Sequence, residues 1–256
     1  MASAFEADFE NGMVGVSRTN PHAMPVLQRA MAAYFFNFTP GPHNLYLRLA
    51  RRLTATAWAG ALATLNYERL LELSLLQAGV QPVVNTPSVP PHKTELCLPH
   101  GCCHFFCEGA RGMSGAVSFS GTDVTTDGDI SAISDPRQFG ARISGDAFPP
   151  VMSYFEPNKK TTAGASFISA QRARFASLVG AAANVAVVGV KVRPGDIHVW
   201  GPLASTSARL FYCAGASVAG TFRDWSRSAR VGKQDIAVDT YFAEAFDGIC
   251  SHVGIS

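Results

Sequence analysis

Two residues that can act on a bound ligand each follow a short apolar stretch of the sequence. Asn66 comes directly after Gly60–Leu65, and its amide offers both a hydrogen-bond donor and an acceptor. His100 follows Thr94–Leu98 and Pro99, and an imidazole with a pKa near neutrality suits proton transfer. Each also has an ordinary alternative, because Asn66 can cap a following helix and His100 can be a satisfied loop residue.

A third set of candidates follows the valine-rich stretch Val185–Val190. Gly189, at the end of this stretch, leaves room for a nucleotide to lie against the backbone. Lys191 and Asp196 come next along the chain. One glycine at a strand end is a common pattern, so this set gains weight only together with Asn66 and His100.

The elements that carry these residues predict an α/β fold. Short apolar stretches alternate with longer segments of helical periodicity, an order that implies right-handed crossovers and a parallel sheet. We therefore predict a Rossmann-like, doubly wound parallel sheet with helices on both faces. Ligands of such sheets bind beyond the carboxyl ends of the strands, so Asn66, His100 and Gly189 are expected on one rim.

Capping and breaking residues set the expected helix limits. Pro25 suits the first turn of a helix at Val26–Phe36, Asn44 can cap a helix through Leu45–Leu53, and Gly79 can end a helix at Tyr67–Gln77. The remaining predicted elements are strands at Val83–Val84 and Leu210–Ala214, helices at Ser166–Gly180 and Asp239–His252, and a small irregular or antiparallel insertion at 109–148. We expect residues 1–256 to form a single domain.

Composition excludes several classes of function. A net charge of +2 over 256 residues does not favour a nucleic-acid or membrane partner. No apolar run reaches the roughly 18–20 residues that span a bilayer. The first ten residues contain Glu6, Asp8 and Glu10 and no basic, apolar leader, which predicts a cytoplasmic protein with reduced thiols.

Four of the six cysteines lie close to His100, at Cys97, Cys102, Cys103 and Cys107. None of them forms a Cys-x-x-Cys pair, which is the usual spacing of zinc ligands. We therefore expect buried, reduced thiols and no metal, although His104 keeps a zinc site open as an alternative.

Taken together, these motifs resemble the sirtuin-like family, and within it the bacterial branch that consumes nicotinamide adenine dinucleotide (NAD). The run from Thr64 to Glu72 is similar to that family's Thr-x-Asn-Tyr-Asp/Glu-x-Leu-Leu-Glu element. A strand ending in His100-Gly101, and a late strand ending in glycine before Asp196, match in the same order. The resemblance covers most of residues 26–216.

The resemblance implies an enzyme that hydrolyses NAD to nicotinamide and ADP-ribose, with NAD as substrate and no metal. It assigns Asn66 to the nicotinamide ribose and to an attacking water, and His100 to general-base catalysis or to the ribose hydroxyls. It also suggests a role in bacterial antiphage defence. The residues that it assigns to NAD binding are Thr64, Tyr67, Glu68, Gly101, Gly189, Lys191 and Asp196.

One expected element has no counterpart. Sirtuin-like domains open with a strand and a Gly-Ala-Gly-x-Ser turn that binds the pyrophosphate, whereas residues 11–17 offer only Asn-Gly-Met-Val-Gly-Val-Ser. A catalytically inactive nucleotide-binding or assembly module therefore stays an alternative, and a protein deacylase a weaker one. We expect residues 1–25, a second copy, a partner protein or a segment of a longer chain to fill the central strand position.

Overall fold

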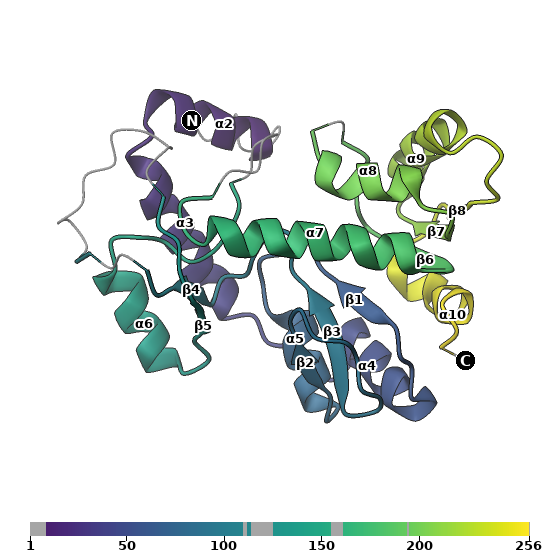
Figure 1. The fold of residues 1–256 in the computed structure, drawn as a ribbon, viewed down its shortest axis with the longest axis horizontal. Helices are drawn as coiled ribbons and strands as arrows, with labels where there is room; N and C mark the ends of the chain where they lie inside the picture. The colour runs from purple at the N-terminus through teal and green to yellow at the C-terminus, as the bar shows by residue number, and fades with distance from the viewer. Residues whose placement is uncertain (1–8, 110–111, 114–124, 155–160, 194, 256) are drawn as a thin grey trace. The chain divides into compact units, whose positions relative to one another are not determined.

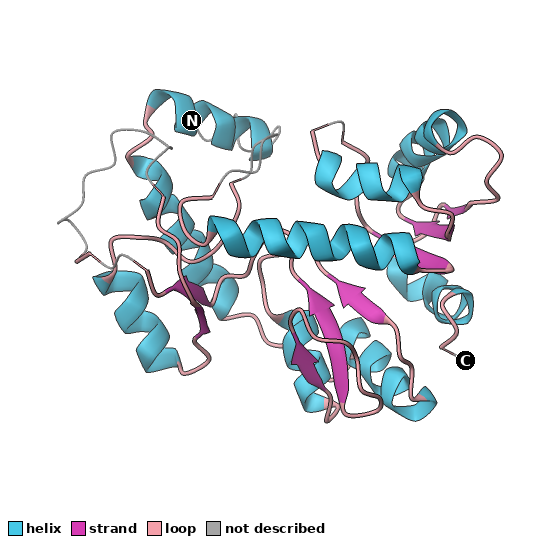
Figure 2. Ribbon diagram, viewed as in Figure 1, coloured by secondary structure: helices cyan, strands magenta, loops and turns pink. Residues whose placement is uncertain are grey.

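The chain has a mixed α/β fold with parallel sheets (Figures 1 and 2). The computed structural model describes residues 9–109, 112–113, 125–154, 161–193 and 195–255. The chain divides into two compact units. Unit 1 is formed from residues 1–39, 64–70 and 98–171, and unit 2 from residues 40–63, 71–97 and 172–256.

The first sheet of unit 2 contains the strands that lead to Asn66 and His100. It has the order β1 (Ala61–Ala63), β3 (Lys93–Cys97) and β2 (Gln81–Val83), and both pairings are parallel. The central strand β3 is buried from Thr94 onward. The two strands predicted before Asn66 and His100 are thus confirmed as neighbours.

The second sheet of unit 2 has helices on both faces. Its order is β6 (Asn184–Val188), β7 (Arg209–Cys213) and β8 (Ile236–Val238), again parallel. On one face Tyr212 of β7 stacks on Phe222 of α9 (Ala216–Ala229), with ring centroids 4.0 Å apart. On the other face Phe211 and Cys213 pack against α10 (Phe242–His252).

The predicted single doubly wound sheet is not confirmed. In the part of the chain that the structure describes, β1 pairs only with β3, and β6 pairs only with β7. A valine-rich stretch such as Val185–Val190 is typical of a buried parallel strand, but here only Val187 is buried while Val185 and Val188 are half-buried. Its position at the edge of the sheet explains the exposure.

Unit 1 combines helices with one antiparallel pair. The helices α2 (Phe9–Thr19) and α3 (Ala23–Phe36) share a core with Tyr154. The strands β4 (Phe105–Cys107) and β5 (Ile130–Ala132) pair within the region expected to hold short antiparallel structure.

A helix inside the expected insertion was not predicted. Helix α6 (Pro136–Gly145) begins where Asp135 accepts a hydrogen bond from the amide of Gln138, with proline in its first turn. Asp135 followed by proline is a helix-start signal that the sequence did contain. Its Phe139 ring stacks on Phe36 with centroids 3.7 Å apart, which joins the helix to α3.

The helices that were predicted begin and end close to their expected limits, whereas α2 and α9 were not predicted. Asn44 caps α4 (Leu45–Thr56) by accepting from the amide of Tyr46, as predicted. Helix α7 (Ala165–Ala181) covers Ser166–Gly180, and α5 (Leu70–Gln77) begins three residues later than expected. Helix α8 (Ile197–Ser205) was not predicted. No helix in the described ranges is long and apolar enough to cross a membrane.

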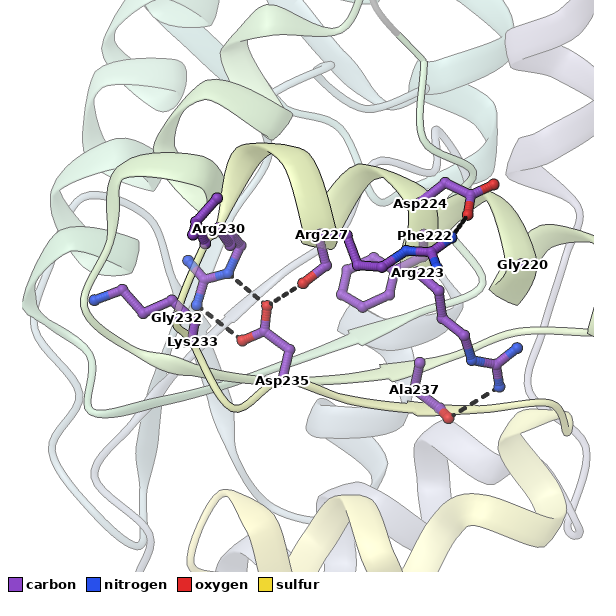
Figure 3. Close-up of a pocket in the computed structure, with 12 residues that line it drawn as sticks. Gly220, Phe222, Arg223, Asp224, Arg227, Arg230, Gly232, Lys233, Asp235 and Ala237 are labelled. Atoms are coloured by element: carbon purple, nitrogen blue, oxygen red, sulfur yellow. Dashed lines mark hydrogen bonds and ion pairs between the residues drawn. The ribbon is translucent and has the colours of Figure 1, made fainter.

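A buried arginine joins the ends of four elements in unit 2. The side chain of Arg230 donates to the carbonyls of Leu203, Thr206 and Ala208 over 2.5, 3.1 and 2.6 Å. It also forms a two-pronged ion pair with Asp235, at 2.7 and 2.9 Å (Figure 3). Because Asp235 in turn accepts from the amide of Leu210, one ion pair connects α8, β7, α9 and β8.

We predict that Arg230→Ala lowers the free energy of unfolding by about 3–5 kcal/mol, because it leaves Asp235 buried without its cation. Urea denaturation measures the loss. The matched control is Arg227→Ala on the same helix, whose ion pair with Asp224 is exposed and whose loss should cost under about 1 kcal/mol. Equal losses in the two variants would contradict this prediction.

The same ion pair predicts a dependence of stability on pH. Burial by itself raises the pKa of Asp235, but hydrogen bonds from Arg230, Ser226 and the Leu210 amide outweigh it, so the pKa is lowered. The stabilisation is therefore complete above the unfolded-state pKa of about 3.9 and is lost as the pH falls through the folded-state pKa. Asp235→Asn should flatten the acid side of the curve of unfolding free energy against pH, and an unchanged curve would refute the assignment.

Candidate functional site

Asn66 and His100 lie on two segments that leave parallel neighbouring strands at the same end. The register pairs Ala63 of β1 with Cys97 of β3, and Asn66 and His100 each come three residues beyond these positions. Both segments, 64–70 and 98–104, belong to unit 1. The common strand end is what the sequence predicted.

A hydrogen bond connects the two segments directly. Nδ1 of His100 lies 3.2 Å from the carbonyl oxygen of Leu65, the residue before Asn66. A carbonyl only accepts, so Nδ1 carries the proton in this contact. In a neutral imidazole Nε2 is then the basic nitrogen, which is the form that a general base requires. The ring is only 6% exposed and stacks on Tyr67.

Glu68 orients the side chain of Asn66. Nδ2 of Asn66 donates to Oε1 of Glu68 over 3.0 Å, and its backbone amide donates to the hydroxyl of Thr64 over 3.1 Å. The other oxygen of Glu68 accepts from the amide of Leu70, where α5 begins. The alternative in which Asn66 caps this helix is therefore wrong, because Glu68 is the cap. Asn66 itself is exposed.

Tyr67 anchors this loop to the interior of unit 1. Its hydroxyl donates to the carbonyl of Ser153 over 2.9 Å, and its carbonyl accepts from the amide of Cys103 over 2.8 Å. The side chain is buried, so Tyr67 acts on the site by fixing the positions of Asn66 and Glu68. No motif of the sequence pointed to Ser153.

Position 101 requires glycine because the backbone of Val151 packs closely against it. Its φ is +81°, and a Cβ placed there would lie 2.0 Å from the carbonyl oxygen of Val151. That carbonyl accepts from the amide of Cys102, and Gly101 bridges to Met152. The resemblance assigned Gly101 to NAD binding. On the Cβ side of Gly101, the space is occupied by the backbone of Val151.

Gly189, Lys191 and Asp196 belong to unit 2. Gly189 has φ +69°, and no described atom lies within 4 Å of its ideal Cβ position. Lys191 is exposed, whereas Asp196 is buried and its carbonyl accepts from the first amides of α8. The structure brings together Thr64, Asn66, Tyr67, Glu68, His100 and Gly101 in unit 1.

A tyrosine fixes the loop after Gly189. The hydroxyl of Tyr212 donates to the carbonyl of Val190 over 2.6 Å. Burial, with the neighbouring Cys213 adding to it, raises the pKa of Tyr212 to about 12, so the hydroxyl stays protonated and keeps donating at neutral pH. The sequence did not identify this anchor.

An open pocket of about 560 Å³ lies elsewhere on unit 2, between α9 and β8 (Figure 3). Its arginines are paired with carboxylates: Arg223 with Asp239, and Arg227 with Asp224. These pairings offset the positive charge of the two arginines. None of the residues proposed from the sequence lines this pocket.

Searches against protein-family models, curated proteins and solved structures found no match to this chain. The sirtuin-like resemblance therefore rests on the motifs of the sequence.

Gly101 and Gly189, which both have positive φ, give a matched test of the packing beside Gly101. Gly189→Ala should cost only the left-handed conformation, about 1–2 kcal/mol of unfolding free energy. Gly101→Ala should cost clearly more, because its Cβ also meets Val151 and the backbone must move. Urea denaturation compares the two variants, and equal losses would show that Val151 does not confine Gly101.

Proposed function

We propose that this protein is an NAD glycohydrolase, which adds water across the bond between nicotinamide and ribose. One observation carries the proposal. The hydrogen bond from His100 to Leu65 joins the two motifs of the sirtuin-like resemblance, so that Asn66 and His100 lie on adjoining segments of unit 1.

The chemistry asks little of the protein beyond orientation and proton transfer. Breaking the glycosidic bond releases neutral nicotinamide and builds positive charge on the ribose, which water then attacks. Asn66, held by Glu68, positions the ribose and the water, and His100 accepts the proton that the water loses. The products are nicotinamide, ADP-ribose and one proton.

The remaining assignments are separate proposals. Thr64 and Glu68 support the ribose side through Asn66, and the buried Tyr67 holds the loop. For Gly189, Lys191 and Asp196, contact with the nucleotide is supported only by the resemblance. The same holds for a role in bacterial antiphage defence and for assembly with a second copy or a partner protein.

A second candidate is a nucleotide-binding or assembly module without turnover. It is favoured by the missing glycine-rich turn and by the outer strands β1 and β6, each of which pairs on one side only among the described strands. A module of this kind would bind NAD or ADP-ribose without releasing nicotinamide.

The test is nicotinamide release from NAD by the purified full chain, followed by chromatography. We expect turnover by the wild type and a loss of about 10²–10⁴-fold in His100→Ala, the range for removal of a general base. Asn66→Ala should also lose most activity. The controls are Asn37→Ala and His92→Ala, exposed residues outside the site, which should keep wild-type rates.

Each other result decides against the hydrolase. Binding of ADP-ribose without nicotinamide release would establish the non-catalytic module. Nicotinamide release that requires an acetyl-lysine peptide would establish the deacylase. Wild-type rates in both Asn66→Ala and His100→Ala would remove these residues from the mechanism.

A further inference from the structure

The turn between Gly101 and β4 gathers three metal-binding side chains inside unit 1. Ligand atoms of Cys102, Cys103 and His104 all lie within 4.8 Å of one another. Each residue is at most 1% exposed. Sγ of Cys102 lies 3.2 Å from Nδ1 of His104. Two thiols and an imidazole are the donors that zinc prefers.

The spacing of these donors is close to that of a tetrahedral zinc site. With bonds of about 2.3 Å to sulfur and about 2.0–2.1 Å to nitrogen, tetrahedral ligands lie roughly 3.5–3.8 Å apart. The separation of 3.2 Å between Cys102 and His104 lies just below this range, and all three donor atoms lie within 4.8 Å of one another, so small side-chain movements bring them onto one ion.

We propose that Cys102, Cys103 and His104 bind one zinc ion. Binding releases the two thiol protons to solvent and leaves His104 neutral. The two thiolates then balance the charge of Zn²⁺, so the buried site carries no net charge. A monovalent ion such as Cu⁺ would leave one negative charge in the interior, which is costly without a buried cation.

Backbone oxygen is available for the fourth zinc position. The carbonyl of Tyr67 lies 3.4 Å from Sγ of Cys102 and accepts from the amide of Cys103. Either this oxygen or a water molecule can complete the tetrahedron. The zinc site would therefore adjoin the loop that carries Asn66 and Glu68.

The surroundings of these thiols differ from those of ordinary core cysteines. A thiol in an apolar core meets carbon atoms, whereas that of Cys102 faces a ring nitrogen and a backbone carbonyl. A bound cation would stabilise this arrangement of polar groups.

The sequence predicted no metal because none of the four cysteines near His100 forms a Cys-x-x-Cys pair. The cluster that forms leaves out Cys97 and Cys107 and adds His104. Three consecutive residues supply the donors because the turn after Gly101 directs their side chains to one point, a geometry that Cys-x-x-Cys patterns do not describe.

The experiment is metal analysis of the full chain, produced with added zinc, freed of loosely bound metal on a chelating resin and compared with variants. We expect about one zinc per chain in the wild type and in Cys107→Ser, a matched buried cysteine outside the cluster. Cys103→Ser and His104→Gln should each lose most of it. Cobalt substitution should give thiolate-to-cobalt charge-transfer absorption in wild type and Cys107→Ser only.

Circular dichroism and thermal unfolding separate loss of metal from loss of fold. Zinc should raise the melting temperature of the wild type and leave that of folded Cys103→Ser unchanged. Wild-type protein that is folded and free of zinc would overturn the proposal, as would zinc retained in both cluster variants, or copper bound in place of zinc. None of these readouts depends on NAD hydrolysis, so the two proposals fail independently.

Discussion

The parallel pairing of β1 with β3 is the constraint on which the candidate site depends. Because the strands run in the same direction, the segments that follow Ala63 and Cys97 leave the sheet at one end. An antiparallel pairing would send them to opposite ends, and a shift in register would separate Leu65 from His100. The contact between His100 and the Leu65 carbonyl is possible only because both conditions are met.

Backbone groups hold the site more than side-chain charges do. The carbonyls of Leu65, Tyr67, Val151 and Ser153 accept from a ring nitrogen, backbone amides and a hydroxyl, and these contacts bring 64–70 and 98–104 together. Backbone carbonyls do not depend on the identity of their residues. This is why residues such as Ser153 and Val151 contribute without having a recognisable motif.

In unit 2, a buried ion pair connects the elements around the second sheet. Its second sheet is short, and one buried ion pair between Arg230 and Asp235 joins the ends of the helices and strands around it. The outer strand β6 is rich in valine yet only half-buried, which is unusual for a parallel strand. An added strand along this edge would bury those valines.

The sequence by itself determined most of the local structure. Asn44 as a cap, the strands before Asn66 and His100, and the helices at 26–36, 166–180 and 239–252 follow from capping, turn and periodicity signals that act over a few residues. The burial of Cys97, Cys102, Cys103 and Cys107 was likewise expected. The α/β class followed from the alternation of these elements.

Only the tertiary structure decided which groups meet. Glu68, and not Asn66, caps α5, and Val151 occupies the space beside Gly101. His104 lies with Cys102 and Cys103. These contacts depend on atoms brought together from distant segments or by one turn. The exposure of β6 at the edge of its sheet could not be predicted from the sequence either. Burial depends on the neighbouring strands, and a valine-rich segment has the same composition in a central or an outer strand.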